Sequence, residues 1–183
     1  MADSLYYLDH RAPFLVADVA AVTLASADKA LYPAAAYPTL GSNYFGFGGK
    51  AQHIVLFGKI TTAATPGNLT IDVYWGSGAD ANGTIIASSA AQTLVASQTN
   101  ISWRIELWIR ARTLGATGTM MCTGYATFGT AVIAAGTFLI PASAAAATTI
   151  DTTASNIISV QAKRSGSTAE TMAVQEFVPV ALN

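Results

Sequence analysis

Charged side chains are scarce in this sequence, and neither sign predominates. The 183 residues include nine Lys and Arg and ten Asp and Glu, so charged residues make up 10% of the chain and the net charge is −1. A typical soluble domain has about 25% charged residues. A nucleic-acid-binding protein needs a surplus of basic side chains to neutralise phosphates, so we expect no nucleic-acid partner. A charge-poor surface instead favours association, because little electrostatic repulsion keeps copies apart.

Cysteine and histidine are almost absent. Cys122 is the single cysteine, which excludes an intrachain disulfide and any metal site built from several thiolates, and we predict it to be a small buried hydrophobic residue. The two histidines, His10 and His53, stand outside any catalytic motif, and no serine has the Gly-x-Ser-x-Gly context of a nucleophile. The sequence therefore predicts no catalytic residue, no cofactor and no metal. We expect a non-enzymatic protein in which His53 is structural.

Long uninterrupted apolar runs are missing as well. The segment most similar to a membrane-spanning helix is 131–150, but Gly136 and Pro141 interrupt it and alanines fill several of its apolar positions. A spanning helix needs about 20 strongly apolar residues without such breaks. The first residues include Asp3 and Asp9 and lack the basic and apolar regions of a secretory signal. We therefore expect a soluble protein with no membrane partner.

The abundant residues are small ones, 36 Ala and 22 Thr, within a composition that is 52% hydrophobic. Their arrangement has a period of two, most clearly in residues 101–112. Every second residue from Ile101 to Ala111 is apolar, whereas the residues between them include Arg104, Glu106 and Arg110. This alternation predicts a strand of an antiparallel sheet with one face buried.

Further strands are expected from β-branched and aromatic segments that turn residues separate. They are residues 53–62, 69–75, 84–87, 92–96, 119–127, 131–140, 156–163 and 171–178. Short strands at this spacing predict an all-β protein, an antiparallel β-sandwich or barrel. We expect one domain over residues 16–183, preceded by an extended N-terminal arm over residues 1–15. Residues 16–24 fit either a strand or a short helix.

Three local patterns resemble known sites, and each has a simpler interpretation. Residues 46–50 resemble a phosphate-binding loop, but Tyr44 and Ala51 stand where the motif needs Gly and Ser or Thr. Residues 80–83 resemble the start of a calcium loop without its later ligands, which favours a turn. The basic and aromatic residues of 104–112 could contact single-stranded nucleic acid. The neutral charge balance and Glu106 favour a face that contacts protein or solvent.

Residues 39–124 resemble jelly-roll structural proteins of tailed-bacteriophage virions. The resemblance is carried by the segments 39–45, 49–50, 57–62, 65–70, 93–97, 99–100 with Trp103, and 115–119, and also by 148–153 and the turn 165–167. Relatives of this type include capsid decoration proteins, head fibres and tail-tip proteins. The resemblance implies a jelly-roll sandwich and a structural place in the virion, and it carries no catalytic residue.

Among these relatives we expect a capsid decoration protein on the shell exterior that binds the major capsid protein and is assembled in the host cytoplasm. The low charge and the outward position of Trp108 in its strand predict that it also binds itself, as a homotrimer. Aromatic side chains are enriched at interfaces because they bring large area with few rotatable bonds. The residues that we predict for the interface are Tyr6, Tyr7, Phe14, Trp108 and Arg110. In this prediction residues 1–14 form part of the contact that bridges neighbouring subunits of the shell.

The alternative is a receptor- or glycan-binding module of a tail tip or tail fibre. Such a site would need exposed aromatic platforms and polar loops, for which Tyr74, Trp75 and the loop 76–83 are the nearest candidates. Trp75 also continues the apolar face of Leu69, Ile71 and Val73, so a core position is expected for it.

Overall fold

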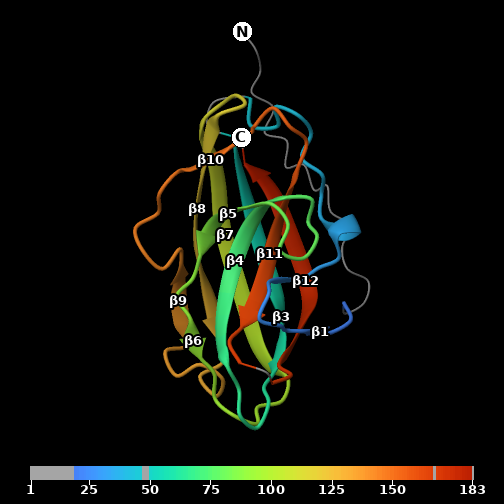
Figure 1. Ribbon diagram of the computed structural model, residues 1–183, viewed down its shortest axis with the longest axis vertical. Coiled ribbons are helices and arrows are strands. Elements are labelled where there is room, and N and C mark those ends of the chain that lie inside the picture. The colour runs from blue at the N-terminus through green and yellow to red at the C-terminus, as the bar shows by residue number, and fades with distance from the viewer. Residues whose placement is uncertain (1–18, 47–49, 167, 183) are drawn as a thin grey trace.

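Two antiparallel sheets pack face to face in the computed structural model, which describes residues 19–46, 50–166 and 168–182 (Figure 1). The protein is an all-β sandwich, as the sequence predicts. The jelly-roll subtype stays a prediction.

Within the described residues, sheet A has seven strands and sheet B has five. Sheet A follows the order β1 (Val22–Thr23), β12 (Thr171–Leu182), β3 (Ala51–Thr61), β7 (Ile101–Thr113), β8 (Gly118–Phe128) and β10 (Thr148–Ile150), and β9 (Thr137–Ile140) also pairs with β8. Sheet B follows the order β2 (Lys29–Ala30), β11 (Ile157–Arg164), β4 (Asn68–Gly76) and β5 (Thr84–Ser88), and β6 (Gln92–Thr93) also pairs with β4. A single 3₁₀ turn, η1 (Ala34–Ala36), is the helical structure of the described residues.

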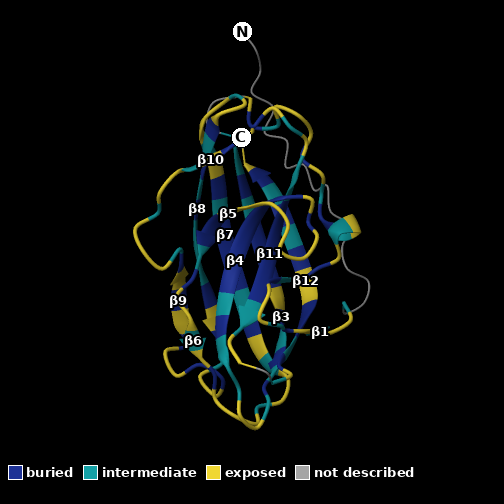
Figure 2. Cartoon of the chain, in the orientation of Figure 1, coloured by how far each residue is buried: buried dark blue, intermediate teal, exposed yellow. Residues whose placement is uncertain are grey.

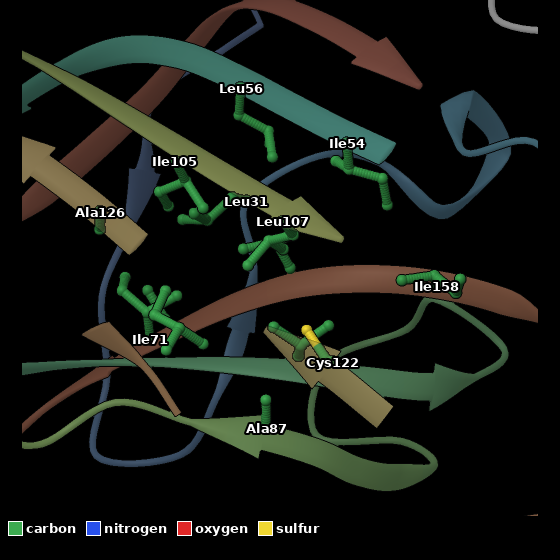
Figure 3. Packing of buried hydrophobic residues seen from close by; sticks show 14 of the residues in the cluster. Leu31, Ile54, Leu56, Ile71, Ala87, Ile105, Leu107, Cys122, Ala126 and Ile158 are labelled. Atoms are coloured by element: carbon green, nitrogen blue, oxygen red, sulfur yellow. The ribbon is translucent and has the colours of Figure 1, made fainter. Parts of the chain in front are cut away.

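The core lies between the sheets, where the inward side chains of both meet (Figures 2 and 3). The alternation predicted for β7 is confirmed, because Trp103, Ile105 and Leu107 are buried there. Cys122 on β8 is 1% exposed, which confirms its predicted burial. Burial raises the pKa of its thiol to about 12, so the sulfur is a protonated part of the apolar core.

Two of the connections between sheet A and sheet B lie together at one end of the sandwich. The chain crosses between β3 and β4 and again between β11 and β12, and these four strands are paired β3 with β12 and β4 with β11. Glu170 joins the two crossings: its carboxylate pairs with Arg164 Nε at 3.1 Å and accepts a hydrogen bond from the Gly67 amide at 3.2 Å. This buried ion pair fixes how the two sheets are joined.

Two predicted strands are shorter than the sequence indicates. In residues 131–140 only β9 is a strand, because residues 129–136 form turns whose backbone bonds are local, such as Val132 N to Gly129 O at 2.8 Å. Val132 and Ile133 are nonetheless buried, so their apolar character reflects a turn that closes the core. In residues 92–96 only β6 is a strand, and the Val95 amide beyond it donates a hydrogen bond to the Val132 carbonyl of that turn at 2.8 Å.

Part of the N-terminal prediction falls on residues that the structure does not describe. The arm over residues 1–15, with Tyr6, Tyr7 and Phe14, lies outside the described residues, as do residues 16–18. From Val19 the chain forms β1 on the edge of β12. None of the helical structure in the described residues is long and apolar enough to cross a membrane.

Candidate interaction surface

The outer face of sheet A, which points away from sheet B, carries both described residues that we predict for an interface. Cross-strand partners share a face of a sheet, so the strand register defines its members. They are Ala51, His53, Val55, Phe57 and Lys59 on β3, Ser102, Arg104, Glu106, Trp108, Arg110 and Arg112 on β7, Met121, Thr123, Tyr125 and Thr127 on β8, Thr137 and Leu139 on β9, and Glu176, Val178, Val180 and Leu182 on β12.

Apolar side chains on this face are open to solvent. Leu139 is 67% exposed, Leu182 38% and Phe57 37%. The two neighbouring strands β3 and β12 contain uninterrupted apolar runs, residues 54–57 and 177–182. Such runs are typical of strands that are covered on both faces, whereas a strand with a solvated face alternates. The inner side of these strands faces the core, so their outer side has the composition of a surface that is also covered.

Glu106 lies at the centre of this face and is nearly buried there. Its carboxylate accepts hydrogen bonds from Tyr125 Oη at 2.6 Å and from His53 Nε2 at 2.9 Å, and it forms an ion pair with Arg104. The Arg104 guanidinium lies 5.3 Å from the centre of the Phe57 ring. Three strands therefore contribute to one ionic cluster under the exposed apolar residues.

The cluster keeps Glu106 ionised. Burial opposes its ionisation, but hydrogen bonds from Tyr125 and His53 and the positive charge of Arg104 outweigh burial and lower the pKa of this carboxyl. The hydrogen bond to Glu106 and, next, burial raise the pKa of the Tyr125 phenol. The carboxylate is thus a fixed acceptor that orients its neighbours.

Trp108 is half-buried, and not freely exposed as its outward position in the alternating pattern suggested. Its ring stacks on the His53 ring, with centroids 4.9 Å apart and planes 18° apart, and contacts Tyr125 at 6.2 Å. His53 is held between this stack and the Glu106 carboxylate. The sequence placed these residues correctly on one face, but the register that brings His53 beside Trp108 was not predictable from it.

The three arginines of β7 differ in whether they have a carboxylate partner. Arg104 is neutralised by Glu106, whereas Arg110 and Arg112 are exposed. Within the described part of the chain neither of these two has a carboxylate partner, and Arg112 Nη2 contacts Met121 Sδ at 3.1 Å. One end of the face, where β7 ends and β3 begins, is therefore positively charged.

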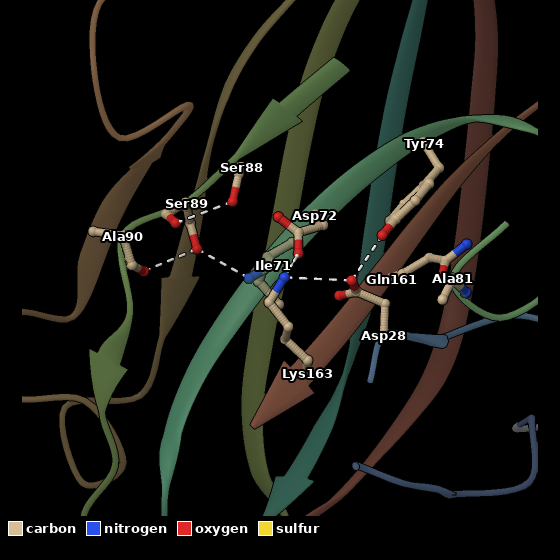
Figure 4. Close-up of polar contacts among 10 residues, drawn as sticks. All are labelled: Asp28, Ile71, Asp72, Tyr74, Ala81, Ser88, Ser89, Ala90, Gln161 and Lys163. Carbon is tan, nitrogen blue, oxygen red and sulfur yellow. Dashed lines mark hydrogen bonds and ion pairs between the residues drawn. The ribbon is translucent and has the colours of Figure 1, made fainter. Parts of the chain in front are cut away.

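The outer face of sheet B is polar and is covered by its own chain (Figure 4). Asp72 on β4 is completely buried, and Lys163 on β11 forms ion pairs with both Asp72 and Asp28, the latter at 3.3 Å. Tyr74 Oη donates a hydrogen bond to Asp28 at 2.7 Å. Burial raises the pKa of Asp28, Tyr74 opposes this, and Asp72 raises it further.

The loop 76–83 folds onto this polar face. Gln161 on β11 accepts a hydrogen bond from the Ala81 amide at 2.7 Å and donates one to the Ala79 carbonyl at 2.9 Å. Asp80 forms a 2.8 Å ion pair with Lys29 and accepts the Ala30 amide. Its carboxylate is used within the chain, which supports the turn interpretation of residues 80–83, and among the described residues no group of three His, Cys, Asp or Glu could hold a metal ion.

The aromatic residues of the glycan-binding alternative are buried. Tyr74 and Trp75 are each 5% exposed and point to opposite sides of sheet B. Trp75 occupies the core, as predicted, and its indole donates a hydrogen bond to the Asp151 carbonyl at 3.2 Å. Neither ring forms an exposed platform in this structure. Residues 46–50 are only partly described, and there Lys50 Nζ lies 3.9 Å from the centre of the Tyr44 ring.

Sequence reasoning found two members of this surface and missed its most exposed ones. It selected Trp108 and Arg110, which the structure brings onto one face of β7. It missed Phe57, Leu139 and Leu182, although the apolar runs of β3 and β12 were a signal for them. The geometry offers a face that combines exposed apolar side chains with charged ones around an ionic cluster, which suits contact with another protein chain. The chain matches no protein-family model, no curated protein and no solved structure.

Proposed function

We propose that this chain is a non-enzymatic structural protein of a tailed-bacteriophage virion, a trimeric capsid decoration protein of jelly-roll type on the shell exterior. In this proposal its partners are two further copies of itself and the major capsid protein. It is assembled in the host cytoplasm, and residues 1–14 add contacts to a neighbouring subunit.

The observation that carries the proposal is the open apolar outer face of sheet A. Five strands spaced about 4.8 Å apart and about eight residues long, at about 3.3 Å per residue, give a face of roughly 600 Å². A standard protein interface covers about 800 Å² on each partner. The face is therefore close in size to one side of a stable subunit contact. Trp108 and Phe57 on it are residue types that interfaces favour.

The composition supports the same conclusion. A protein that is repeated many times on a shell must pack closely against identical copies, and a net charge of −1 minimises repulsion between them. Small Ala and Thr side chains lose little rotamer entropy when neighbouring subunits approach.

Sedimentation of the purified full chain tests the trimer, and we expect trimers at micromolar concentration. Counting copies of the chain in purified particles tests the placement in the virion. Many copies per particle support a place on the shell. A few copies per particle would instead indicate a tail protein and would overturn the decoration function. A chain that sediments as a monomer both alone and after release from particles would overturn the trimer.

A further inference from the structure

A ring of three identical subunits needs two different surfaces that fit each other. Only a two-fold contact can join a surface patch to itself, whereas a three-fold ring is built from head-to-tail contacts between unlike patches. The outer face of sheet A is one such patch. Its counterpart must therefore be sought on another part of the same chain.

We propose that the counterpart is the N-terminal segment, residues 1–18: the segment of each copy lies on the outer face of sheet A of the next copy in the ring. This inference rests on the proposed trimer and names the contact that closes it. Two other arrangements are possible: a trimer that forms through the folded sandwiches alone, and an N-terminal segment that contacts only the capsid shell.

The place where the described chain begins favours this exchange. The Val19 amide donates a hydrogen bond to the Val174 carbonyl at 2.9 Å, and β1 runs antiparallel to β12 with Val22 opposite Met172. From Thr23 back to Val19, the described chain thus runs along β12 in the direction of Leu182. Eighteen residues can span up to about 59 Å at about 3.3 Å each, whereas the whole of β12 measures about 40 Å. The segment is long enough to reach beyond its own copy.

The charges of the two surfaces are complementary. Residues 1–18 contain three aspartates, Asp3, Asp9 and Asp18, and one arginine. The end of the face near Leu182 carries Arg110, which lies opposite Ala51 as Leu182 does, and Arg112. These two guanidinium groups have no carboxylate partner among the described residues. An acidic segment would supply the missing counter-charges.

The apolar residues are complementary as well. Tyr6, Tyr7 and Phe14 give the segment three aromatic side chains. The face offers exposed Phe57 and Leu139 and the half-buried ring of Trp108. Large side chains that are covered in this way contribute most of the energy of an interface. Three such contacts closed into one ring reinforce each other, because each additional contact becomes intramolecular.

Tryptophan fluorescence offers a direct test on the full chain. Trp75 and Trp103 are 5% and 3% exposed, so quenching by acrylamide reports mainly on half-buried Trp108. We expect weak quenching in the trimer and stronger quenching after dilution to monomers. A variant with Tyr6→Ser, Tyr7→Ser and Phe14→Ser should lose this dilution dependence and show strong quenching throughout. Protection of Trp108 that persists in diluted monomers would show that each segment covers its own copy, and would overturn the exchange.

A charge exchange provides a second test with its own internal control. Arg110→Glu with Arg112→Glu should abolish trimers in sedimentation, and so should Asp3→Lys with Asp9→Lys. The combination of all four changes should restore them, which a defect in folding would not do. If both pairs of changes leave the trimer intact, the exchange is wrong.

The two proposals can fail separately. A wild-type chain that is monomeric at all concentrations overturns the trimer and with it the exchange. A wild-type trimer that the triple Ser variant retains, even when that variant no longer binds particles, overturns the exchange alone, because the segment then serves the shell.

Discussion

The two outer faces of the sandwich differ in what covers them. On sheet B, the strand β11 alternates from Ile158 to Lys163. Its outward Gln161 is bonded to the loop 76–83 and to Ser159, and its outward Lys163 is bonded to the carboxylates of Asp28 and Asp72. On sheet A, β3 and β12 have apolar residues on both sides, and their outer side chains are partly exposed. The centre of this face of sheet B is thus covered within one chain, and Ile85 on the edge strand β5 is exposed beside it. Sheet A has the composition of a surface that another chain completes.

The difference extends to the ionic clusters. The two cations are similarly exposed, Lys163 at 33% and Arg104 at 42%, but their carboxylates differ in their other partners. Among the described residues the fully buried Asp72 carboxylate is bonded to Lys163 alone, whereas Glu106 also accepts hydrogen bonds from Tyr125 and His53. Burial makes an ion pair sensitive to the loss of one partner, because the remaining charge cannot be hydrated. Hydrogen bonds from other donors make the carboxylate less sensitive, because they still satisfy it when the cation is removed. Matched substitutions in the two clusters therefore measure the contrast directly.

The largest effect is expected for Lys163→Met. It leaves the Asp72 carboxylate buried without its cation, and the free energy of unfolding should fall by about 3 kcal/mol. Arg104→Met, the matched change on sheet A, should cost less than about 1 kcal/mol, because Glu106 keeps its hydrogen bonds from Tyr125 and His53 and the removed guanidinium is partly exposed. Urea unfolding of both variants measures the difference. Equal losses would show that the two faces do not differ in this respect.

The next effect concerns the loop that covers sheet B. Gln161→Leu removes the two hydrogen bonds that hold the Ala81 amide and the Ala79 carbonyl, and it should destabilise the protein by about 1–3 kcal/mol. Gln92→Leu is the control, because the Gln92 side chain bonds only to the nearby Ala90 carbonyl in an exposed position. If both variants unfold at the same urea concentration, the loop is not fastened by Gln161.

Much of this architecture could be predicted from the sequence, but the contrast between the outer faces of the two sheets could not. Alternation in residues 101–112 was sufficient to predict β7 and its inward side, because a period of two has one structural meaning. The covering of sheet B depends on Gln161 meeting a loop that lies 80 residues earlier in the chain, and no local pattern encodes such a pairing. For residues 131–140 the sequence predicted a strand where residues 129–136 form a buried turn. A buried turn and a strand can have the same apolar composition, so the pattern does not distinguish them.

The pH dependence of stability should differ between the faces. The pKa of Asp28 is raised in the folded state, first by burial, so its stabilising contribution is complete below its unfolded pKa and is lost as pH rises through the folded value. The pKa of Glu106 is lowered, so its contribution is present above its unfolded pKa and is lost as pH falls through the folded value. These two carboxyl groups therefore have opposite slopes.

Two isosteric variants measure how each carboxyl group contributes to the pH dependence of the free energy of unfolding. Asp28→Asn should leave stability at neutral pH unchanged or higher, while Glu106→Gln should lower it at neutral pH and have little effect in acid. Urea unfolding of each variant from acidic to neutral pH, at one protein concentration, measures both. A loss of stability at neutral pH in Asp28→Asn would mean that its hydrogen bond with Tyr74 outweighs the cost of its burial.

The smallest effect on the monomer is expected for Leu139→Ser. This side chain is 67% exposed, so its removal should change the free energy of unfolding of the monomer by no more than about 0.5 kcal/mol. In the proposed trimer this residue is covered by another copy. Association stabilises the folded chain, so the stability of the wild type should rise with protein concentration. In the variant, which associates more weakly, this rise should be smaller. Ile85→Ser, on the outer face of sheet B and 41% exposed, is the matched control and should leave the concentration dependence unchanged. If Leu139→Ser also leaves it unchanged, Leu139 is not part of the subunit contact, and the exposed apolar residues of sheet A must be explained without a partner.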